Sequence, residues 1–362
     1  MFIVVIIIIL ALLLTCLETQ GLLRHGMMIG FSLLTILGAI HYNYGNDYMV
    51  YYNLYYTITS EPLSFNTLIE DSGYKEKGWV LLCQLFSKLG GFFMMVAVLN
   101  VVQNFIIYNF IRKNVNAKWW TMSVFVYTFT TVLYLMNFSM MRQGFVVCVF
   151  LGLWHFIENK KWVIAFLVIY LCSFIHSSAI VLLPFAFWGY IPVKNGKVLA
   201  MILGVLFVAL WMSGQLLNSF LEIFMTVDTF SEYFDTYSDL ENNKTYGVGF
   251  ALMMIPLILT EYYFFKIKDT DKIKRMVLLS SLSFIIMPFS QMVPLIGRIG
   301  TYFTIYRIAS VPIIYRSIKN RSMRLIYVIL YVFLHVYSCW MFFTQGVFSK
   351  PYQTFHTIFE AI

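Results

Sequence analysis

The chain has 362 residues, of which 60% are hydrophobic and only 12% are charged. A soluble domain carries about 25% charged residues, so this composition excludes an ordinary soluble protein and indicates a polytopic membrane protein. The net charge of +8 does not point to nucleic acid, because the basic residues are concentrated in loops between apolar runs. The five cysteines lack metal-site spacing, so we expect no metal and no cofactor.

Apolar runs recur along the whole chain and predict an all-α fold in which residues 1–362 form a single transmembrane domain. The first run has no basic flank and no cleavage site after it, so we expect a retained helix rather than a signal peptide. The segment Trp79–Leu89 is too short to cross a membrane and is predicted to be re-entrant or interfacial. About twelve transmembrane helices are predicted, near residues 2–17, 26–40, 91–111, 119–135, 144–157, 162–175, 178–191, 198–216, 249–265, 276–293, 299–315 and 325–343.

Loop charge predicts which side of the membrane each connection faces. Alternate connections hold most of the 25 basic residues, and loops rich in lysine and arginine face the cytoplasm. This alternation places both termini outside. It also makes two larger loops, 41–78 and 217–248, extracytoplasmic, and both are acidic and aromatic.

Tyrosines at positions 48, 51, 52, 55 and 56 of the first large loop recur at helical spacing. Phe230, Tyr233, Phe234 and Tyr237 repeat the pattern in the second loop. Each segment is predicted to form an amphipathic helix on the outer membrane surface. Two interpretations are open: the rings form an aromatic belt that anchors the protein, or some of them stack on sugars.

Four ionisable residues are predicted at the extracytoplasmic ends of spans. Arg142 and His176 flank one predicted hairpin, so they meet at the same face, and Asp47 and Arg298 are placed on that face too. The fixed fork of donors on arginine suits a phosphate, and histidine or aspartate can accept a proton from a hydroxyl. Each residue also has a purely structural interpretation. An arginine could extend to the lipid headgroups, the histidine could be part of a polar helix end, and the aspartate could cap a helix.

The eleventh predicted span carries a second arginine. On a continuous α-helix Arg307 would lie about 13.5 Å deeper than Arg298 and on roughly the opposite face. We therefore expect Tyr302, which shares the face of Arg298, to be in the site. Arg307 is expected to be a buried structural partner or a deep ligand near mid-membrane.

Five short motifs carry a likeness to a known family: Gly45-Asn46-Asp47-Tyr48 with Tyr51 and Tyr52, Glu76-Lys77-Gly78-Trp79, Met141-Arg142-Gln143-Gly144, Phe174-Ile175-His176-Ser177-Ser178-Ala179, and more weakly Arg298 with Tyr302-Phe303 and Pro312. In this order and membrane placement they resemble the EpsG-like group of Wzy-type bacterial polysaccharide polymerases. Such proteins usually have an arginine shortly before a Gly-Thr/Ser-Asp element. Here residues 40–43 contain none and Asn46 replaces the hydroxyl residue, which leaves anion binding to Arg142 and Arg298.

The resemblance implies a metal-independent glycosyltransferase of the bacterial cytoplasmic membrane. It would transfer a growing glycan from polyprenyl diphosphate onto the next lipid-linked repeat unit at the extracytoplasmic face. Expected partners are the polyprenyl-diphosphate-linked oligosaccharide donor and acceptor, the lipid bilayer and a chain-length regulator protein. His176 or Asp47 would be the general base, with His176 favoured. The substrate-binding residues would be Arg142, Gln143, Arg298, Tyr302, Arg307, Tyr48 and Ser177.

Other classes of protein stay open. A flippase or transporter of lipid-linked oligosaccharides would also have about twelve spans, but it favours charged residues near mid-membrane and repeated halves. A membrane acyltransferase that modifies a surface glycan would use His176 as its base. A ligase that attaches finished polymer to another acceptor has the chemistry of a polymerase, and the sequence does not separate the two.

Overall fold

The computed structural model is helical over most of the chain that it describes. It describes residues 1–60, 76–193, 204, 259–260, 262–264, 266–267, 270–289, 294–344 and 350–360. The predicted spans near 198–216 and 249–265 lie largely outside these residues, and the predicted loop 217–248 lies entirely outside them.

The secondary structure is dominated by α-helices joined by short turns. The α-helices are α1 (Phe2–Thr19), α2 (Gly26–Ile40), α3 (Tyr48–Thr59), α5 (Lys77–Leu89), α6 (Gly91–Asn114), α7 (Trp120–Phe129), α8 (Met141–Gly152), α9 (Trp154–Glu158), α10 (Trp162–Ser173), α15 (Asp271–Phe289), α16 (Pro294–Thr304), α17 (Arg307–Ser317) and α18 (Arg321–Thr344). The 3₁₀-helices are η1 (Ala117–Trp119), η2 (Leu135–Phe138), η3 (Ser177–Tyr190), η4 (Lys350–Tyr352) and η5 (Ile358–Glu360). Two short strands, β1 (His41–Tyr42) and β2 (His356–Thr357), pair in antiparallel fashion.

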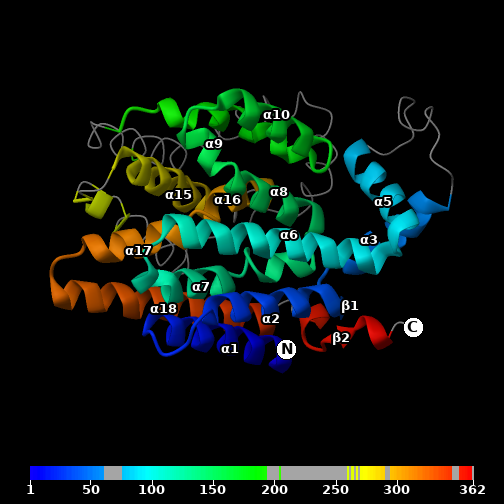
Figure 1. Cartoon of the computed structure of the whole chain (residues 1–362), viewed down its shortest axis with the longest axis horizontal. Helices are drawn as coiled ribbons and strands as arrows, with labels where there is room; N and C mark the ends of the chain where they lie inside the picture. The colour runs from blue at the N-terminus through cyan, green and yellow to red at the C-terminus, as the bar shows by residue number, and fades with distance from the viewer. Residues whose placement is uncertain are drawn as a thin grey trace.

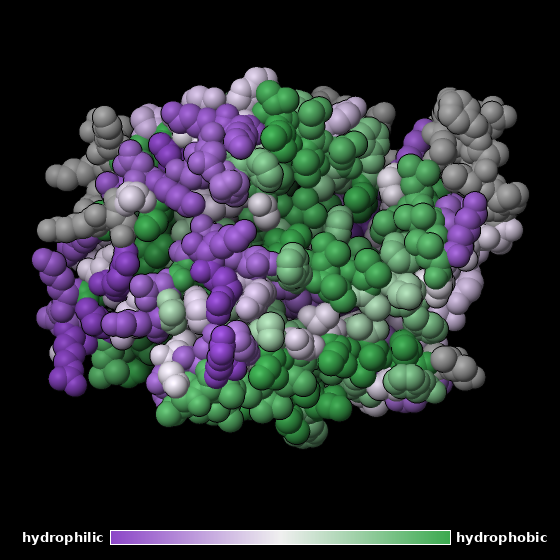
Figure 2. Space-filling model, in the orientation of Figure 1, coloured by the Kyte–Doolittle hydropathy of each residue, from purple (hydrophilic) through white to green (hydrophobic). Residues whose placement is uncertain are grey.

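The long helices lie side by side along roughly one direction, with α2 packed between α1 and α6 (Figure 1). Large apolar side chains such as Ile6, Val101 and Phe333 are more than half exposed. Figure 2 shows broad hydrophobic surfaces in the middle and on the right of the view, and hydrophilic residues gathered on the left. Exposed apolar surface of this extent is typical of helices that face lipid.

Three of the described helices, α1, α6 and α18, are long and apolar enough to cross a membrane. α2, α10 and η3 are apolar but shorter. These helices support a helical membrane protein. The number of twelve spans stays a prediction.

Two predicted spans differ from a single continuous α-helix. The span near 299–315 is formed by α16 and α17, which Ile305 and Tyr306 separate. The continuous-helix geometry expected for Arg307 is therefore wrong, because Arg307 begins a new helix. The span near 178–191 is the 3₁₀-helix η3, which contains Pro184. A proline has no backbone N–H to donate within a helix.

Both ends of the chain lie at one end of the bundle. The amino group of Met1 donates to the carbonyl oxygen of Gln353 at 2.6 Å, and His41, at the end of α2, pairs with Thr357. Figure 1 shows α3 and α5 at this same end. The two termini thus share one end of the bundle, and the side of the membrane that this end faces stays a prediction.

Candidate functional site

Glu76 is the centre of a polar cluster at the end of the bundle that holds α3 and α5. It precedes α5 and is only 8% exposed. Its carboxylate accepts hydrogen bonds from His176 Nδ1 and from the backbone N–H of Ser177, both at 2.9 Å, and it forms an ion pair with Arg142 Nη1. Burial favours the neutral acid, but the hydrogen bond from His176 and the charge of Arg142 outweigh it and lower the pKa of Glu76. These four residues, called the polar cluster below, join Arg142 to His176 through a carboxylate.

Arg142 lies in the first turn of α8 and packs against two aromatic rings. Its Nε donates to the hydroxyl of Tyr51 at 3.3 Å. The guanidinium lies 5.0 Å from the centre of the Tyr51 ring and 6.0 Å from that of Trp79, within cation–π range. The arginine side chain is still 23% exposed. Its orientation is thus fixed by the protein while part of it stays accessible to a ligand.

His176 reverses the chain between α10 and η3 and has its two ring nitrogens in different surroundings. Since a carboxylate only accepts hydrogen bonds, Nδ1 carries the proton that is donated to Glu76, and in the neutral imidazole Nε2 then has a lone pair. Nε2 is buried and has no hydrogen-bond partner among the described residues. An imidazole nitrogen in this state can accept a proton from a substrate hydroxyl.

The serines after His176 connect the polar cluster to α16. Ser178 Oγ and the hydroxyl of Tyr302 share a hydrogen bond of 2.8 Å. Ser177 Oγ lies 3.4 Å from the carboxylate of Glu76. Tyr302 is completely buried, so it supports the start of η3 rather than presenting an open ring.

A second link joins α16 to α8. The side-chain amide of Gln143 donates to the carbonyl oxygen of Arg298 at 2.7 Å, and Gln143 is buried. Arg142 is the neighbour of Gln143 in the first turn of α8, so this bond positions the backbone of Arg298 relative to Arg142. The side chain of Arg298 is partly exposed.

Asp47 precedes α3, but its side chain forms no capping hydrogen bond with that helix. Its backbone N–H donates to Ser139 Oγ at 3.0 Å, which ties the loop before α3 to the turn before α8. Burial raises the pKa of Asp47, and the charges of Arg298 and Arg142 oppose the rise. Asp47 is therefore in the electrostatic field of both arginines, and its raised pKa suits a base that works nearer neutral pH.

Two glycines let these segments approach closely. Gly78 donates its backbone N–H to the carbonyl oxygen of Phe174 at 2.8 Å, and a Cβ at this position would lie 2.9 Å from that carbonyl. Gly45 has φ +115°, and a Cβ there would lie 2.8 Å from the carbonyl oxygen of Phe138. The first contact holds the start of α5 against the end of α10. The second holds the loop before α3 against the turn before α8.

A comparison with models of protein families shows which family the chain belongs to. The model of the EpsG family matches residues 23–354. The chain belongs to the EpsG family. No match was found among curated proteins or among solved structures. EpsG membership indicates a polysaccharide polymerase-like role and is consistent with a glycosyltransferase-type enzyme.

In this EpsG-family chain, two of the residues predicted to bind substrate, Tyr48 and Arg307, contact other parts of the protein. Tyr48 is completely buried, and its hydroxyl donates to the carbonyl oxygen of His41 at 3.1 Å. Arg307 donates from Nε to Ser283 Oγ at 2.7 Å, and its guanidinium lies 3.8 Å from the ring centre of Phe284. Tyr48 is thus part of the core, and Arg307 links α17 to α15.

The predicted aromatic face of α3 also packs against protein. Tyr48, Tyr51 and Tyr55 are buried in a hydrophobic core with Trp79 of α5 and Phe92 of α6. Burial of these three rings does not fit either an open sugar-stacking platform or a membrane belt. Their packing holds α3 and α5 together beside the polar cluster.

Glu76 is the cluster residue that the sequence-based set of site residues omits. Its side-chain partners are Arg142 and His176, which lie 66 and 100 residues away in sequence. An acidic residue at the end of a long polar loop is usually solvated. The available signal was its motif, Glu76-Lys77-Gly78-Trp79, which the EpsG resemblance already included.

Proposed function

We propose that this EpsG-family protein polymerises a polysaccharide, by transferring a growing glycan from polyprenyl diphosphate to a hydroxyl of the next lipid-linked repeat unit. The observation that carries the proposal is the carboxylate of Glu76, which joins Arg142 to His176. A cation suited to a diphosphate and an imidazole suited to a hydroxyl therefore belong to one cluster. Membership of the EpsG family supports the same class of reaction.

The reaction forms one glycosidic bond and breaks one bond to phosphate. The oxygen of the acceptor hydroxyl attacks the anomeric carbon of the donor sugar that is attached to the carrier. The bond from this carbon to the diphosphate oxygen breaks, and polyprenyl diphosphate leaves with the bonding electrons. The proton of the acceptor hydroxyl passes to the base, so neither a redox partner nor a nucleotide-sugar is consumed.

His176 is the base in this proposal. Glu76 accepts the hydrogen bond from Nδ1, which leaves the Nε2 lone pair to take the proton of the acceptor hydroxyl. The same carboxylate would stabilise the imidazolium that forms. General base catalysis of this kind contributes roughly 10²–10⁴-fold to a rate. Asp47 is the second candidate for this role, because its pKa is raised.

Arg142 and Arg298 bind the diphosphate in this proposal. The planar donor fork of a guanidinium matches the oxygens of a phosphate. Negative charge develops on the leaving diphosphate in the transition state, and fixed cations stabilise that charge. The hydrogen bond from Gln143 to the backbone of Arg298 supports a fixed spacing between the two arginines.

The test compares glycan products in cells that carry site variants. Arg142→Ala, Arg298→Ala and His176→Ala should each abolish long polymer and leave single lipid-linked repeat units. Gel profiles of the surface glycan and mass spectrometry of extracted lipid-linked sugars measure the outcome. Arg24→Ala and His25→Asn are the matched controls, because both residues are exposed in the connection between α1 and α2.

Two outcomes would contradict the proposal. Polymer of normal length in all three site variants would show that the polar cluster does not carry the reaction. Lipid-linked repeat units that stay inaccessible to an externally added glycosidase would instead indicate a flippase. The controls are expected to make polymer of normal length, because their side chains lie outside the cluster.

A further inference from the structure

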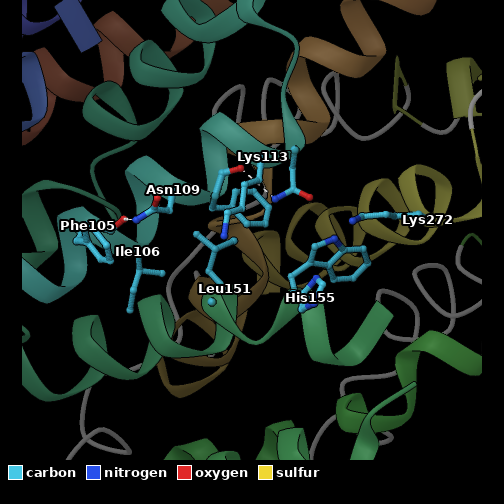
Figure 3. Close-up of a pocket in the computed structure, with 11 residues that line it drawn as sticks. Phe105, Ile106, Asn109, Lys113, Leu151, His155 and Lys272 are labelled. Carbon is cyan, nitrogen blue, oxygen red and sulfur yellow. Dashed lines mark hydrogen bonds between the residues drawn. The ribbon is translucent and has the colours of Figure 1, made fainter. Parts of the chain in front are cut away.

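A cleft at the other end of α8 takes no part in the proposed reaction. It lies between the end of α6, the end of α8, α9 and the start of α15, and its volume is about 340 Å³ (Figure 3). Arg142 lies in the first turn of α8, whereas Gly152, the last residue of this helix, lines the cleft. Ten residues of α-helix separate the two by about 15 Å. The cleft is therefore distinct from the polar cluster.

One part of the cleft is cationic. Lys113, His155 and Lys272 line it, and Figure 3 shows Lys272 extending from α15 toward the other two. None of the described residues that line it is acidic. Within the described part of the chain, neither lysine forms an ion pair.

The carboxylates near this end of the bundle have basic partners of their own. Glu158 of α9 pairs with Arg275 at 3.2 Å. The remaining pairs are Asp271 with Lys274 at 4.0 Å and Glu18 with Arg112 at 3.0 Å. Glu158 is within the electrostatic field of Lys272, but none of these three carboxylates forms an ion pair with a lysine of the cleft.

The other part of the cleft is apolar. Phe105, which is 66% exposed, and Ile106 line it from α6. Eight residues separate Phe105 from Lys113, which corresponds to about 12 Å along the helix. α6 is long and apolar enough to cross a membrane, so Lys113 lies at its polar end and Phe105 at the depth of the hydrocarbon. The cleft therefore extends from headgroup level into the acyl-chain region.

We propose that this cleft binds an anionic membrane phospholipid. Lys113 and Lys272 hold its phosphate, and the first part of an acyl chain lies along Phe105 and Ile106. Basic pockets between transmembrane helices are typical sites for anionic headgroups. Trp154 also lines the cleft, and its buried indole N–H has no acceptor among the described residues.

The experiment uses the full-length protein in detergent and counts bound lipids by native mass spectrometry. Phosphatidylglycerol and phosphatidylcholine with identical acyl chains are titrated separately. We expect tighter binding of phosphatidylglycerol, and a loss of roughly 30-fold in its affinity in the double variant Lys113→Gln/Lys272→Gln. Lys118→Gln/Lys161→Gln removes the same charge from exposed positions outside the cleft and should bind like the unsubstituted protein.

A second variant distinguishes a lipid from a free phosphate. A Cβ at Gly152 would lie 3.3 Å from Cγ2 of Ile106, so Gly152→Leu fills the apolar part and leaves both lysines in place. Binding of phosphatidylglycerol should fall roughly tenfold, while binding of glycerol 3-phosphate should not change. Unchanged phosphatidylglycerol binding in Gly152→Leu would overturn the acyl-chain site and indicate an anion site only.

The lipid-binding role of Lys113 and Lys272 is tested by two further comparisons. Equal affinity for the two lipids, or unchanged binding in the double glutamine variant, would overturn the proposal. Lys113→Arg/Lys272→Arg keeps both charges and should retain binding. This variant keeps the test decisive where the glutamine variant fails to fold.

Discussion

At the scale of single residues, the charge of Glu76 determines how Arg142 and His176 are arranged. A buried carboxylate is costly unless it is paired and hydrogen-bonded. Here the arginine supplies the counter-charge, and the histidine and the backbone of Ser177 supply the hydrogen bonds. One substitution should therefore disturb both the proposed diphosphate site and the proposed base.

Glu76→Gln keeps the shape of the side chain and removes its charge. We expect polymer formation to fall by roughly 10²–10⁴-fold, because His176 loses the anion that orients it and stabilises its protonated form. The free energy of unfolding should fall by about 2 kcal/mol, the usual worth of a hydrogen bond to a charged group. Polymer length in cells and thermal unfolding in detergent measure the two effects. Asp271→Asn, at an exposed site in the first turn of α15, is the control.

The stability difference between Glu76→Gln and the unsubstituted protein should depend on pH. The pKa of Glu76 is lowered from its ordinary value of 4.5, so the stabilisation by its charge is fully present above that pH. It is lost as the pH falls below 4.5 and through the lower pKa of the folded protein. Thermal unfolding should show the full stability difference between the two proteins at pH 7, and this difference should become smaller as the pH is lowered below 4.5. A difference that widens on acidification would contradict this role of Glu76.

The sequence predicts part of this arrangement. A hairpin between two spans brings Arg142 and His176 to one face, and their types suggest anion binding and proton transfer. Helical spacing, however, places Tyr48 and Tyr51 on the same face of α3, and only packing decides which one contacts Arg142. That contact belongs to Tyr51. Glu76 is harder still to predict, because all its side-chain partners are distant in sequence.

At the scale of secondary-structure elements, the start of α5 is held against the end of α10 by Gly78. We predict that Gly78→Ala lowers polymer formation by roughly tenfold or more. A Cβ at this position would lie 2.9 Å from the carbonyl of Phe174 and would force α5 outward. A misplacement of about 1 Å can cost 10²-fold in rate. Alanine favours an isolated helix over glycine by about 1 kcal/mol. A loss of activity therefore reports the close approach rather than a weaker helix.

Ser87→Ala, at an exposed position near the other end of α5, is the control for Gly78→Ala. Polymer length in cells is the measurement for both variants. Full activity together with higher thermal stability in Gly78→Ala would show that α5 tolerates the shift, and would remove the positioning role of the glycine.

Hydropathy predicts the helical character of the chain but not the breaks within its helices. The mean hydropathy of a window depends on composition, whereas a break depends on local hydrogen bonds. Between α16 and α17 the residues 303–308 contain neither glycine nor proline, so no local signal marks the interruption. The placement of Arg307 against Ser283 follows from that interruption and could not be derived from helical geometry.

At the scale of the whole molecule, the C-terminal segment supports the loop that carries Asp47. The backbone N–H of Gly45 donates to the carbonyl oxygen of Pro351 at 3.4 Å, and the rings of Tyr44 and Tyr352 lie 5.1 Å apart. Tyr352 is buried. The conformation of the first loop thus depends on residues near the other end of the chain.

Tyr352→Ala should loosen this loop. Removing a buried aromatic side chain costs about 3–5 kcal/mol, and here the loss should appear as faster amide hydrogen exchange in residues 41–47, with shorter polymer. Phe359→Ala is the control, because that ring is 72% exposed. Unchanged exchange in residues 41–47 would show that the loop does not need the C-terminal segment.

The alternation of loop charge predicts that both termini lie on one side, and the structure places them at one end of the bundle. The contacts between them are not predictable in the same way. Strands of two residues carry no usable periodicity, and the pairing of His41 with Thr357 joins segments at opposite ends of the sequence. The charge bias predicts which side of the membrane a loop faces, but it does not predict which segment the loop contacts.

The contact between Met1 and Gln353 spans 352 residues of sequence. At a synthesis rate of about 5–20 residues per second, the ribosome needs roughly 20–70 s to produce the second partner after the first. During that interval the loop that carries Asp47 lacks the support of the C-terminal segment. A chain that stops before Tyr352 therefore lacks the ring contact with Tyr44, and the loop gains this support only after synthesis has passed residue 352.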